Sequence, residues 1–349
     1  MPINVAVIGA GSWGTTVAAL AAVNAPTILW ARRPELAAQI NDAHINGEYL
    51  ANFMLPEQLQ ATSTLKDAVS HADVLVMAVP SHGYRDVAAE AAPYVRPWVP
   101  VVSLTKGIER SSRKRMSEVT SDEMPGHPVA VLTGPNLAKE ILGGQPAASV
   151  VAIDDEVIAA ELQRIFSRPS LRIYTNPDVV GCEVGGVVKN VIAIASGMAV
   201  GMGFGDNTRA TLITRGLAEM TRLGMAAGAN PLTFAGLAGI GDVIATCGSG
   251  LSRNHRLGEE LAKGRSWAEI EATLPGTAEG AYTVDAALAL ADRYDVEMPI
   301  AREVHNALFE GKSVQRCMVD LLARESKDEL ADYDLWVARQ AADAEVAAE

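Results

Sequence analysis

Short apolar runs alternate with helix-like stretches through the first half of the chain. Seven of these runs lie at residues 3–8, 26–33, 72–82, 99–109, 127–141, 145–153 and 171–176. The runs have the length of strands, and the stretches between them have the spacing of helices. This β–α alternation predicts a doubly wound sheet, in which the C-terminal ends of parallel strands face one ligand crevice.

The second half of the chain has a different pattern. From about Glu183 onward the strand-like runs disappear, Ala, Leu, Met and Gly dominate, and the spacing is helical at residues 209–228 and 251–264. At 349 residues the chain also exceeds the roughly 250–300 residues that one hydrophobic core usually supports. We therefore expect an α/β doubly wound domain over residues 1–180, an all-α domain over 181–327 and an acidic C-terminal tail over 328–349.

Composition and charge exclude several classes of protein. The net charge of −13 argues against a nucleic-acid partner, which would need a basic face. The three cysteines are far apart and form no CxxC pair, so neither a disulfide framework nor a metal site is expected. The first apolar run is too short for a leader segment, and the charge-free run at 223–241 is interrupted by glycines and Pro231. We expect a cytoplasmic protein without integral membrane association.

A glycine-rich loop follows the first apolar run. Gly9, Gly11 and Gly14 form the pattern G-x-G-x-x-G between a strand-like run and a helix-like stretch. Gly9 permits a tight turn, Gly11 lets a pyrophosphate approach the backbone, and Gly14 lets the helix pack closely on the strand. The N-terminus of that helix then offers free N–H groups to phosphates. The motif in this setting predicts a Rossmann-type domain that binds a dinucleotide.

The end of the second strand-like run indicates which dinucleotide is preferred. An NAD site usually has an acidic residue there, which accepts hydrogen bonds from the ribose 2′-OH, whereas this chain has Arg32 and Arg33. Guanidinium groups match a 2′-phosphate. The pattern favours NADP(H), with NAD(H) possible as a second cofactor. The alternative is a solvated pair of arginines that precedes a helix beginning at Pro34.

Lys189 is an exception in an otherwise apolar segment, residues 185–201. A buried charge without a partner costs several kcal/mol or more, so a lysine in such a place is a candidate acid or base. The alternative is a lysine whose stem lies along apolar surface while its ammonium group reaches water. Asp242 is a second exception, in the apolar and glycine-rich stretch 235–254. The two residues could pair with each other, for catalysis or for stability alone.

Two further polar features belong to the candidate site. Ser252, Arg253 and Asn254 together offer a hydroxyl, a guanidinium and an amide, which suit a phosphate or a polyol. The alternative is a helix N-cap followed by a surface arginine. Lys106 follows the strand-like run that ends in SLT, so it is expected over the crevice unless it is an exposed loop lysine.

Taken together, these blocks resemble the NAD(P)-dependent glycerol-3-phosphate dehydrogenases over about residues 3–327. The blocks that carry the resemblance, in the same order, are GAGSWGTT, LWARRPE, AVPSH, SLTKGIE, TGPNLAKEI, EVGGVVKNVIAIASGMAVG, GDNTRATLITRGLAEM, LAGIGDVIATC, SRNHRLGEELAKG and GTAEGAYTV. The resemblance implies reduction of dihydroxyacetone phosphate to sn-glycerol 3-phosphate for glycerophospholipid synthesis. It also implies a homodimer and no metal.

The resemblance also implies roles for individual residues. Lys189 would be the proton donor and acceptor, with Asp242 as its charged partner. The residues implied to surround the substrate are Lys106, Gly134, Asn136, Lys189, Asp242, Ser252, Arg253 and Asn254. Those implied to line the cofactor are Gly9, Gly11, Ser12, Trp13, Gly14, Arg32, Arg33, Lys106, Ala138, Arg253, Thr277 and Glu279.

Two other functions remain open at this point. One is a different two-domain NAD(P)-dependent dehydrogenase, for example one that acts on a ketopantoate-like substrate. Such an enzyme could share the glycine loop and a catalytic lysine, but it is not expected to carry the Ser252–Asn254 cluster. The other is a non-catalytic dinucleotide-sensing protein, which gives no reason for Lys189 and Asp242 to lie in apolar runs.

Overall fold

The computed structural model describes residues 2–250, 252–273, 278–325 and 328–329. Its N-terminal part is built on one eight-stranded sheet with the strand order β3-β2-β1-β4-β5-β6-β7-β8. All neighbouring strands are parallel except β6 and β7, which run antiparallel. The strands are β1 Val5–Ile8, β2 Thr27–Trp30, β3 Gln60–Thr62, β4 Val74–Met77, β5 Val101–Ser103, β6 Val129–Thr133, β7 Ala147–Ala152 and β8 Leu171–Asn176.

Helices cover both faces of this sheet because its central strands are apolar on both sides. In β1, Val5 and Val7 pack into a core shared with α1, α2 and α7, whereas Ala6 and Ile8 pack into a core shared with α3, α4 and α5. A strand buried on both faces reads as a continuous apolar run, as VAVI does. The helices are α1 Ser12–Asn24, α2 Pro34–Ala43, α3 Leu65–Val69, α4 Ser81–Ala91, α5 Met116–Glu123, α6 Ala138–Leu142 and α7 Glu156–Phe166, with a 3₁₀ turn η1 at Ala92–Tyr94.

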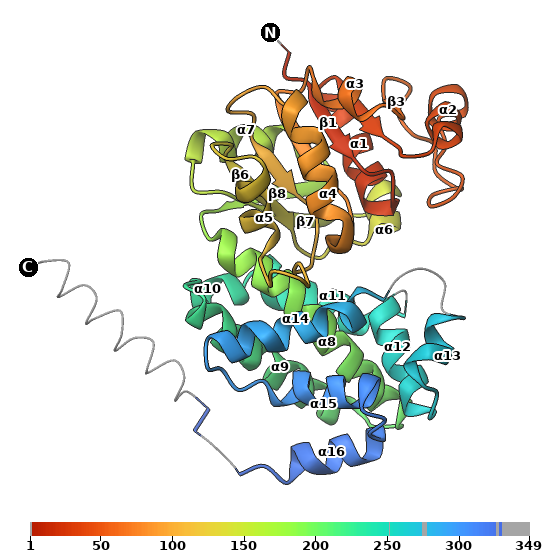
Figure 1. Ribbon diagram of the computed structural model, residues 1–349. Coiled ribbons are helices and arrows are strands. Elements are labelled where there is room, and N and C mark those ends of the chain that lie inside the picture. Colours follow the sequence, from red (N-terminus) through yellow and green to blue (C-terminus); the bar gives the residue numbers. More distant parts are fainter. Residues whose placement is uncertain (1, 251, 274–277, 326–327, 330–349) are drawn as a thin grey trace, which may run out of the picture.

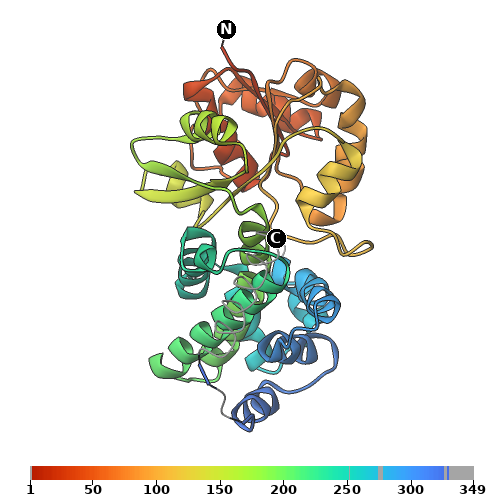
Figure 2. The same cartoon turned by 90° about the vertical axis from the view of Figure 1, so that its left-hand side faces the viewer.

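The C-terminal part is helical and packs around α8, which lies beneath the sheet domain in Figure 1. Helix α8 spans Val179–Gly201 and is buried along nearly its whole length, from Gly181 to Ala199. The other elements are α9 Asp206–Ala226, α10 Pro231–Phe234, a π-helical turn η2 Leu237–Gly241, α11 Asp242–Gly248, α12 Arg253–Ala262, α13 Trp267–Glu271, α14 Glu279–Arg293, α15 Pro299–Phe309 and α16 Val314–Leu322. Both views show the two parts stacked, with the chain passing between them at the start of α8 (Figures 1 and 2).

Two glycines bring α12 against the backbone of α8. A Cβ on Gly197 would lie 1.9 Å from the carbonyl oxygen of His255, and one on Gly258 would lie 2.0 Å from that of Ile194. Any side chain at either position would force the helices apart. This close packing therefore fixes the N-terminus of α12, with its polar cluster, over the middle of α8.

The predicted doubly wound sheet followed by a helical region is confirmed, with two differences in the sheet. The edge strand β3 has three residues and was not expected, since so short a segment carries no readable alternation. The direction of β7 was not expected either, because an apolar run buries the same residues whichever way it runs. The sheet ends at Asn176, and α8 begins at Val179. Of the expected tail, only residues 328–329 are described.

Within the part of the chain that the structure describes, two stretches are long and apolar enough to cross a membrane by length and composition alone, Val179–Gly201 and Pro231–Gly248. The first is α8, whose apolar window is 89% buried inside the protein, as expected of a central core helix. The second joins α10, η2 and α11, with non-helical angles at Gly239 (φ −103°, ψ −107°), and its window is 44% buried. The first stretch thus owes its composition to packing, and the second is not one continuous α-helix.

Candidate active site

The glycine loop has the geometry that its spacing predicts. Gly9 has φ +118°, and a Cβ there would lie 2.6 Å from the carbonyl oxygen of Ala78. A Cβ on Gly14 would lie 2.0 Å from the carbonyl oxygen of Gly9, whereas one on Gly11 would meet nothing within 4 Å. Helix α1 begins directly after this loop, and no side chain caps its N-terminus. The uncapped N–H groups beside open space at Gly11 fit the pyrophosphate of a dinucleotide.

Arg32 and Arg33 follow β2 and are both exposed. Arg33 is the N-cap residue of α2, which begins at Pro34, and its guanidinium forms an ion pair with Glu48. Arg32 makes no ion pair within the described parts of the chain. The position of the pair therefore agrees both with a 2′-phosphate site and with the alternative of solvated arginines at a helix start. The carboxylate of Glu48 pairs with one of the two guanidinium groups, that of Arg33.

Four further residues expected at the cofactor lie on three different helices. Ser12 and Trp13 open α1, and the indole Nε1 of Trp13 is buried without a hydrogen-bond partner among the described residues. Ala138 is the first residue of α6, and Glu279 is the first residue of α14. Thr277 lies outside the described residues, so its expected role has no structural counterpart here.

The central feature of the site is a cluster of Lys106, Asp242 and Lys189, here called the lysine–aspartate cluster. The ammonium group of Lys106 lies 2.5 Å from Oδ2 of Asp242, and that of Lys189 lies 3.0 Å from Oδ1. Lys106 also donates to the carbonyl oxygen of Gly134 at 2.8 Å. One carboxylate thus holds two lysines, one from the sheet domain and one from the helical domain.

A hydroxyl completes the cluster on the side of Lys189. The ammonium group of Lys189 donates to Oγ1 of Thr246 at 2.9 Å, and this hydroxyl donates to Oδ1 of Asp242 at 3.1 Å. Thr246 follows Asp242 by one turn of α11, so both side chains face α8. The sequence pattern did not single out Thr246, because a threonine on a helix usually faces solvent or bonds its own helix.

Burial and mutual attraction set the charges of the cluster. Asp242 is 2% exposed and Lys189 is 8% exposed, so Lys189 does not extend its ammonium group into water as the alternative required. Burial would raise the pKa of the Asp242 carboxyl, but the two lysines hold that pKa below its ordinary value. Burial lowers the pKa of Lys106 to about 8, partly opposed by the carboxylate of Asp242. The cluster therefore places a titratable ammonium group in a buried position near neutral pH.

Glycines in α8 and η2 make room for this cluster. A Cβ on Gly185 would lie 2.4 Å from the carbonyl oxygen of Ala238, so η2 passes directly over α8 and places Asp242 beside Lys189. A Cβ on Gly186 would lie 3.3 Å from the stem of Lys106. The GG pair in EVGGVVKN thus lets two segments from opposite sides approach the turn of α8 that precedes Lys189.

One hydrogen-bond donor among the expected substrate residues around Gly134 has no partner within the described residues. Gly134 has φ +129°, and its carbonyl oxygen accepts the hydrogen bond from Lys106. The hydroxyl of Ser149 donates to Oδ1 of Asn136, while Nδ2 of Asn136 is buried without a partner among the described residues. A buried amide donor with no partner next to Gly134 fits a polar ligand at this place.

In the Ser252–Asn254 cluster, Ser252 and Asn254 bond to other parts of the protein, whereas Arg253 is exposed. Ser252 is the N-cap of α12 and accepts from the backbone N–H of His255, while Arg253 is exposed at the first position of that helix. Asn254 is buried and donates to Oδ1 of Asn190 at 2.9 Å, and its own Oδ1 accepts from the N–H of Gly280 at 3.0 Å. The alternative of an N-cap followed by a surface arginine therefore describes the contacts of Ser252 and Arg253. Asn254 joins α12, α8 and α14 beside Lys189.

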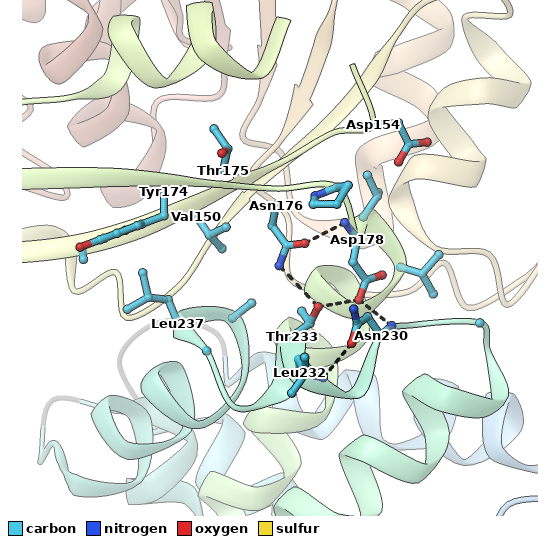
Figure 3. A pocket seen from close by; sticks show the side chains of 17 residues that line it. Val150, Asp154, Tyr174, Thr175, Asn176, Asp178, Asn230, Leu232, Thr233 and Leu237 are labelled. Atoms are coloured by element: carbon cyan, nitrogen blue, oxygen red, sulfur yellow. Dashed lines mark hydrogen bonds between the residues drawn. The ribbon is translucent and has the colours of Figure 1, made fainter. Parts of the chain in front are cut away.

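A separate cavity of about 900 Å³ lies where β7 and β8 meet α10 and η2 (Figure 3). Its lining includes Asp154 and Asp178 but no lysine, arginine or histidine. Asp178 is already used within the protein, since its Oδ2 accepts from the N–H of Asn230 at 2.9 Å and from the hydroxyl of Thr233 at 2.7 Å. None of the residues expected at the substrate or cofactor lines this cavity, and its charge does not suit a phosphate.

The sequence matches one protein family over nearly the whole described chain. The family described as NAD-dependent glycerol-3-phosphate dehydrogenase matches with its N-terminal part over residues 4–159 and with its C-terminal part over residues 178–319. An NAD(P)+ glycerol-3-phosphate dehydrogenase from Sphingopyxis alaskensis is 56% identical over 312 residues, 89% of this chain and 93% of that protein. The enzyme of that name from Mycobacterium avium is 47% identical over 321 residues, 92% of this chain and 94% of that protein.

A solved structure agrees with these matches. The crystal structure of glycerol-3-phosphate dehydrogenase from Coxiella burnetii superposes with a TM-score of 0.88 at 34% identity. It covers 93% of this chain and 99% of the other. The likeness therefore extends over both the sheet domain and the helical domain.

Proposed function

The chain belongs to the family of NAD-dependent glycerol-3-phosphate dehydrogenases, and on that premise we propose how its residues carry out the reaction. The protein is an NAD(P)-dependent oxidoreductase that interconverts dihydroxyacetone phosphate and sn-glycerol 3-phosphate. We propose reduction as its direction, to supply sn-glycerol 3-phosphate for glycerophospholipid synthesis. The observation that carries the proposed mechanism is the lysine–aspartate cluster, which lies between the dinucleotide-binding domain and the helical domain.

In the reduction, the oxygen of the keto group must receive a proton. A reduced nicotinamide cofactor, when bound at the glycine loop, would supply a hydride for the keto carbon, and negative charge would develop on the keto oxygen. Lys189 gives a proton to that oxygen, which leaves its amine beside Asp242 and Thr246 until solvent restores the proton. General acid catalysis of this kind contributes about 10²–10⁴-fold. In the reverse direction the same amine accepts the proton of the alcohol.

The cluster is suited to an anionic substrate by its charge and its unused donors. Two ammonium groups and one carboxylate leave one net positive charge. Each ammonium group has three N–H donors, and the contacts within the described structure use two on Lys189 and two on Lys106. The remaining donor on each lysine is available to the substrate. Because these donors are already oriented by Asp242, little reorganisation is needed when charge develops on the oxygen.

We assign the binding of the substrate phosphate to Arg253, with Asn136 as a further donor. Arg253 is exposed at the N-terminus of α12, and the next residue, Asn254, donates to Asn190, which follows Lys189 on α8. A guanidinium can bind a phosphate with two hydrogen bonds. The buried Nδ2 of Asn136 is a further donor without a partner among the described residues.

Arg253→Ala should lower kcat/KM for dihydroxyacetone phosphate by about 10- to 100-fold, since a charge-assisted hydrogen bond of this kind contributes about 1.5–3 kcal/mol. Activity with unphosphorylated dihydroxyacetone should change little. Steady-state kinetics with both substrates measures the difference, and NADPH binding is titrated in the same variant because Arg253 is also expected at the cofactor. The matched control is Arg316→Ala, which removes an exposed arginine of α16 at the far end of the helical domain. An equal loss with both substrates would show that Arg253 does not contact the phosphate.

For the cofactor, we propose a preference for NADPH over NADH. The support is the pair of exposed arginines after β2, at the place where the adenosine ribose of a dinucleotide lies in this fold. Glu48 opposes this preference in part, since it pairs with Arg33 and would repel a 2′-phosphate. Arg32 is therefore assigned the larger share of the selectivity.

Arg32→Asp combined with Arg33→Ser should weaken NADPH binding far more than NADH binding, by about 1–3 kcal/mol for each charge-assisted hydrogen bond that the substitutions remove. Fluorescence titration of both cofactors gives the two dissociation constants. Glu48→Gln is the paired control, because it frees Arg33 and should tighten NADPH without affecting NADH. If the double variant loses affinity for NADH and NADPH to the same extent, these arginines do not read the 2′-phosphate.

The reaction itself is tested by mixing the purified protein with NADPH or NADH and following oxidation of the cofactor. The proposal predicts turnover with dihydroxyacetone phosphate and little with ketopantoate or other ketones. Preferred turnover of ketopantoate would indicate a different two-domain dehydrogenase. Cofactor binding without turnover of any ketone would indicate a sensing protein. A homodimer and a cytoplasmic location remain expectations, the first of which light scattering can measure.

A further inference from the structure

Glu183 is a buried carboxylate that joins the helical domain to the sheet domain. It lies near the start of α8 and is 6% exposed. Its Oε2 is 2.7 Å from a guanidinium nitrogen of Arg115 and accepts a hydrogen bond from the hydroxyl of Ser117 at 2.5 Å. Its Oε1 accepts from the backbone N–H of Ser117 at 2.8 Å. Burial raises the pKa of Glu183 above its ordinary value, while Arg115 and Ser117 oppose that shift.

Arg115 closes the loop that carries Lys106. This loop, residues 104–115, runs from the end of β5 to the start of α5, and Ile108 and Arg115 form an antiparallel bridge across it. Within the loop, the N–H of Glu109 donates to the carbonyl oxygen of Lys114 at 2.9 Å. Any movement of Arg115 is therefore transmitted to Ile108, two residues from Lys106.

The loop is anchored on both of its sides. On the sheet domain, Arg85 holds the carboxylate of Glu109 with two hydrogen bonds of 2.8 Å. On the helical domain, Ile108 belongs to the helical core, and Glu183 holds Arg115. Two carboxylates of the helical domain pair with this loop: Asp285 of α14, which is partly exposed and lies 3.7 Å from Arg110, and Glu183, which is buried.

The same helix that carries Glu183 also carries Lys189, six residues further on. Through Arg115, Glu183 therefore connects the loop that carries Lys106 to the helix that carries Lys189. This connection does not involve Asp242. This second route matters for an anionic substrate, because the substrate and the carboxylate of Asp242 would attract the same two ammonium groups.

We propose that Glu183 is a positioning residue for the reaction, which holds the Lys106 loop in register with Lys189 through Arg115 and Ser117. It does not touch the substrate. The inference rests on the proposed function, because it assigns Glu183 a task only if both lysines act on one substrate. Misplacement of a reacting group by about 1 Å can lower a rate about 10²-fold, so a distant residue of this kind has a measurable effect.

Glu219 offers a matched control within the same domain. It is also a buried carboxylate, 3% exposed, and it also accepts from the start of a helix, through the N–H of Ile300 at 2.6 Å and that of Ala301 at 3.3 Å. Glu219 lies on α9 and its partners lie at the start of α15, so it contacts neither lysine segment. Substitution of Glu219 therefore removes a buried carboxylate without altering the segments that carry Lys106 and Lys189.

The test compares Glu183→Gln with Glu219→Gln. We expect Glu183→Gln to lower kcat/KM for dihydroxyacetone phosphate by about 10- to 100-fold, with the dissociation constant of NADPH within about twofold of the parent. Glu219→Gln should lower the melting temperature by a similar amount and leave kcat/KM unchanged. Equal kinetic effects of the two variants would overturn the proposal.

A double-mutant cycle with Lys106→Met gives the decisive readout. If Glu183 acts through Lys106, adding Glu183→Gln to Lys106→Met should produce no further loss in kcat/KM. Losses that multiply would overturn the proposal and assign Glu183 a purely structural role. If Glu183→Gln does not fold, Ser117→Ala is put through the same cycle, because it removes the hydroxyl that donates to Glu183 and accepts from Arg115. The parent protein is assayed first, and absence of turnover there would refute the proposed function rather than the role of Glu183.

Discussion

Lys189→Met is expected to lower turnover of dihydroxyacetone phosphate by at least about 10²-fold in a protein that remains folded. The loss follows because the thioether offers no proton to the oxygen that receives negative charge. Binding of NADPH should stay close to normal, since the glycine loop and the arginines after β2 belong to the other domain. Steady-state kinetics and cofactor titration on the same preparation measure the two effects.

The fold should tolerate this change for a reason that the structure supplies. Lys189 lies among apolar residues of α8, and methionine has a similar length and no charge to bury. Asp242 would keep Lys106 as its partner at 2.5 Å, so the substitution does not leave a buried carboxylate alone. The melting temperature should therefore change by only a few degrees. Lys312→Met, which removes a lysine paired with Glu303 and Asp320 near α16, serves as the control for removal of an ion-paired lysine.

Asp242→Asn is expected to have the larger effect on stability. It leaves two ammonium groups, with side chains 13% and 10% exposed, beside each other without the carboxylate that holds them. Removing one partner from a buried ion pair typically costs about 3–5 kcal/mol. Turnover should fall less than in Lys189→Met, because Lys189, the proposed proton donor, is still present. Denaturant unfolding measures the first effect, and an unchanged free energy of unfolding would mean that the aspartate is not holding the lysines.

The same variant should shift the pH dependence in a defined direction. Burial lowers the pKa of Lys106 to about 8, and the Asp242 carboxylate opposes that shift. Without the carboxylate the pKa of Lys106 should fall further, so the site loses an ammonium group at lower pH. The alkaline limb of the profile of kcat/KM against pH should therefore move to lower pH in Asp242→Asn. A limb that stays in place, or moves to higher pH, would contradict this electrostatic account.

The main elements of the fold, and the pairing of Lys189 with Asp242, could be predicted from the sequence because each leaves a local pattern. A strand buried on both faces reads as an apolar run, as in VAVI, and a lysine or aspartate inside an apolar stretch stands out, as Lys189 and Asp242 do. Local patterns carry no information about partners from distant segments. The hydrogen bond of Lys106 with Asp242 joins residues 136 positions apart, and no spacing rule predicts it.

The residues that the sequence did not reveal have no unusual chemistry and no unusual sequence neighbours. Thr246 and Asn190 are single polar residues on helices, which usually face solvent or bond their own helix. Their roles appear only once α8, α11 and α12 are packed together. Glu183 marked only the end of the strand-like region, and its bond to Arg115 required knowledge of where the loop after β5 lies. Packing, rather than composition, distinguishes these residues from others of the same kind.

The central claim, that Lys189 supplies the proton in reduction of dihydroxyacetone phosphate, is tested most directly by single-turnover kinetics. Enzyme loaded with NADPH is mixed with excess dihydroxyacetone phosphate, and oxidation of the bound cofactor is followed in the parent protein and in Lys189→Met. The account predicts a rate at least about 10²-fold lower in the variant, with the dissociation constants of NADPH and of the substrate little changed. A single-turnover rate in the folded variant within about threefold of the parent would contradict it.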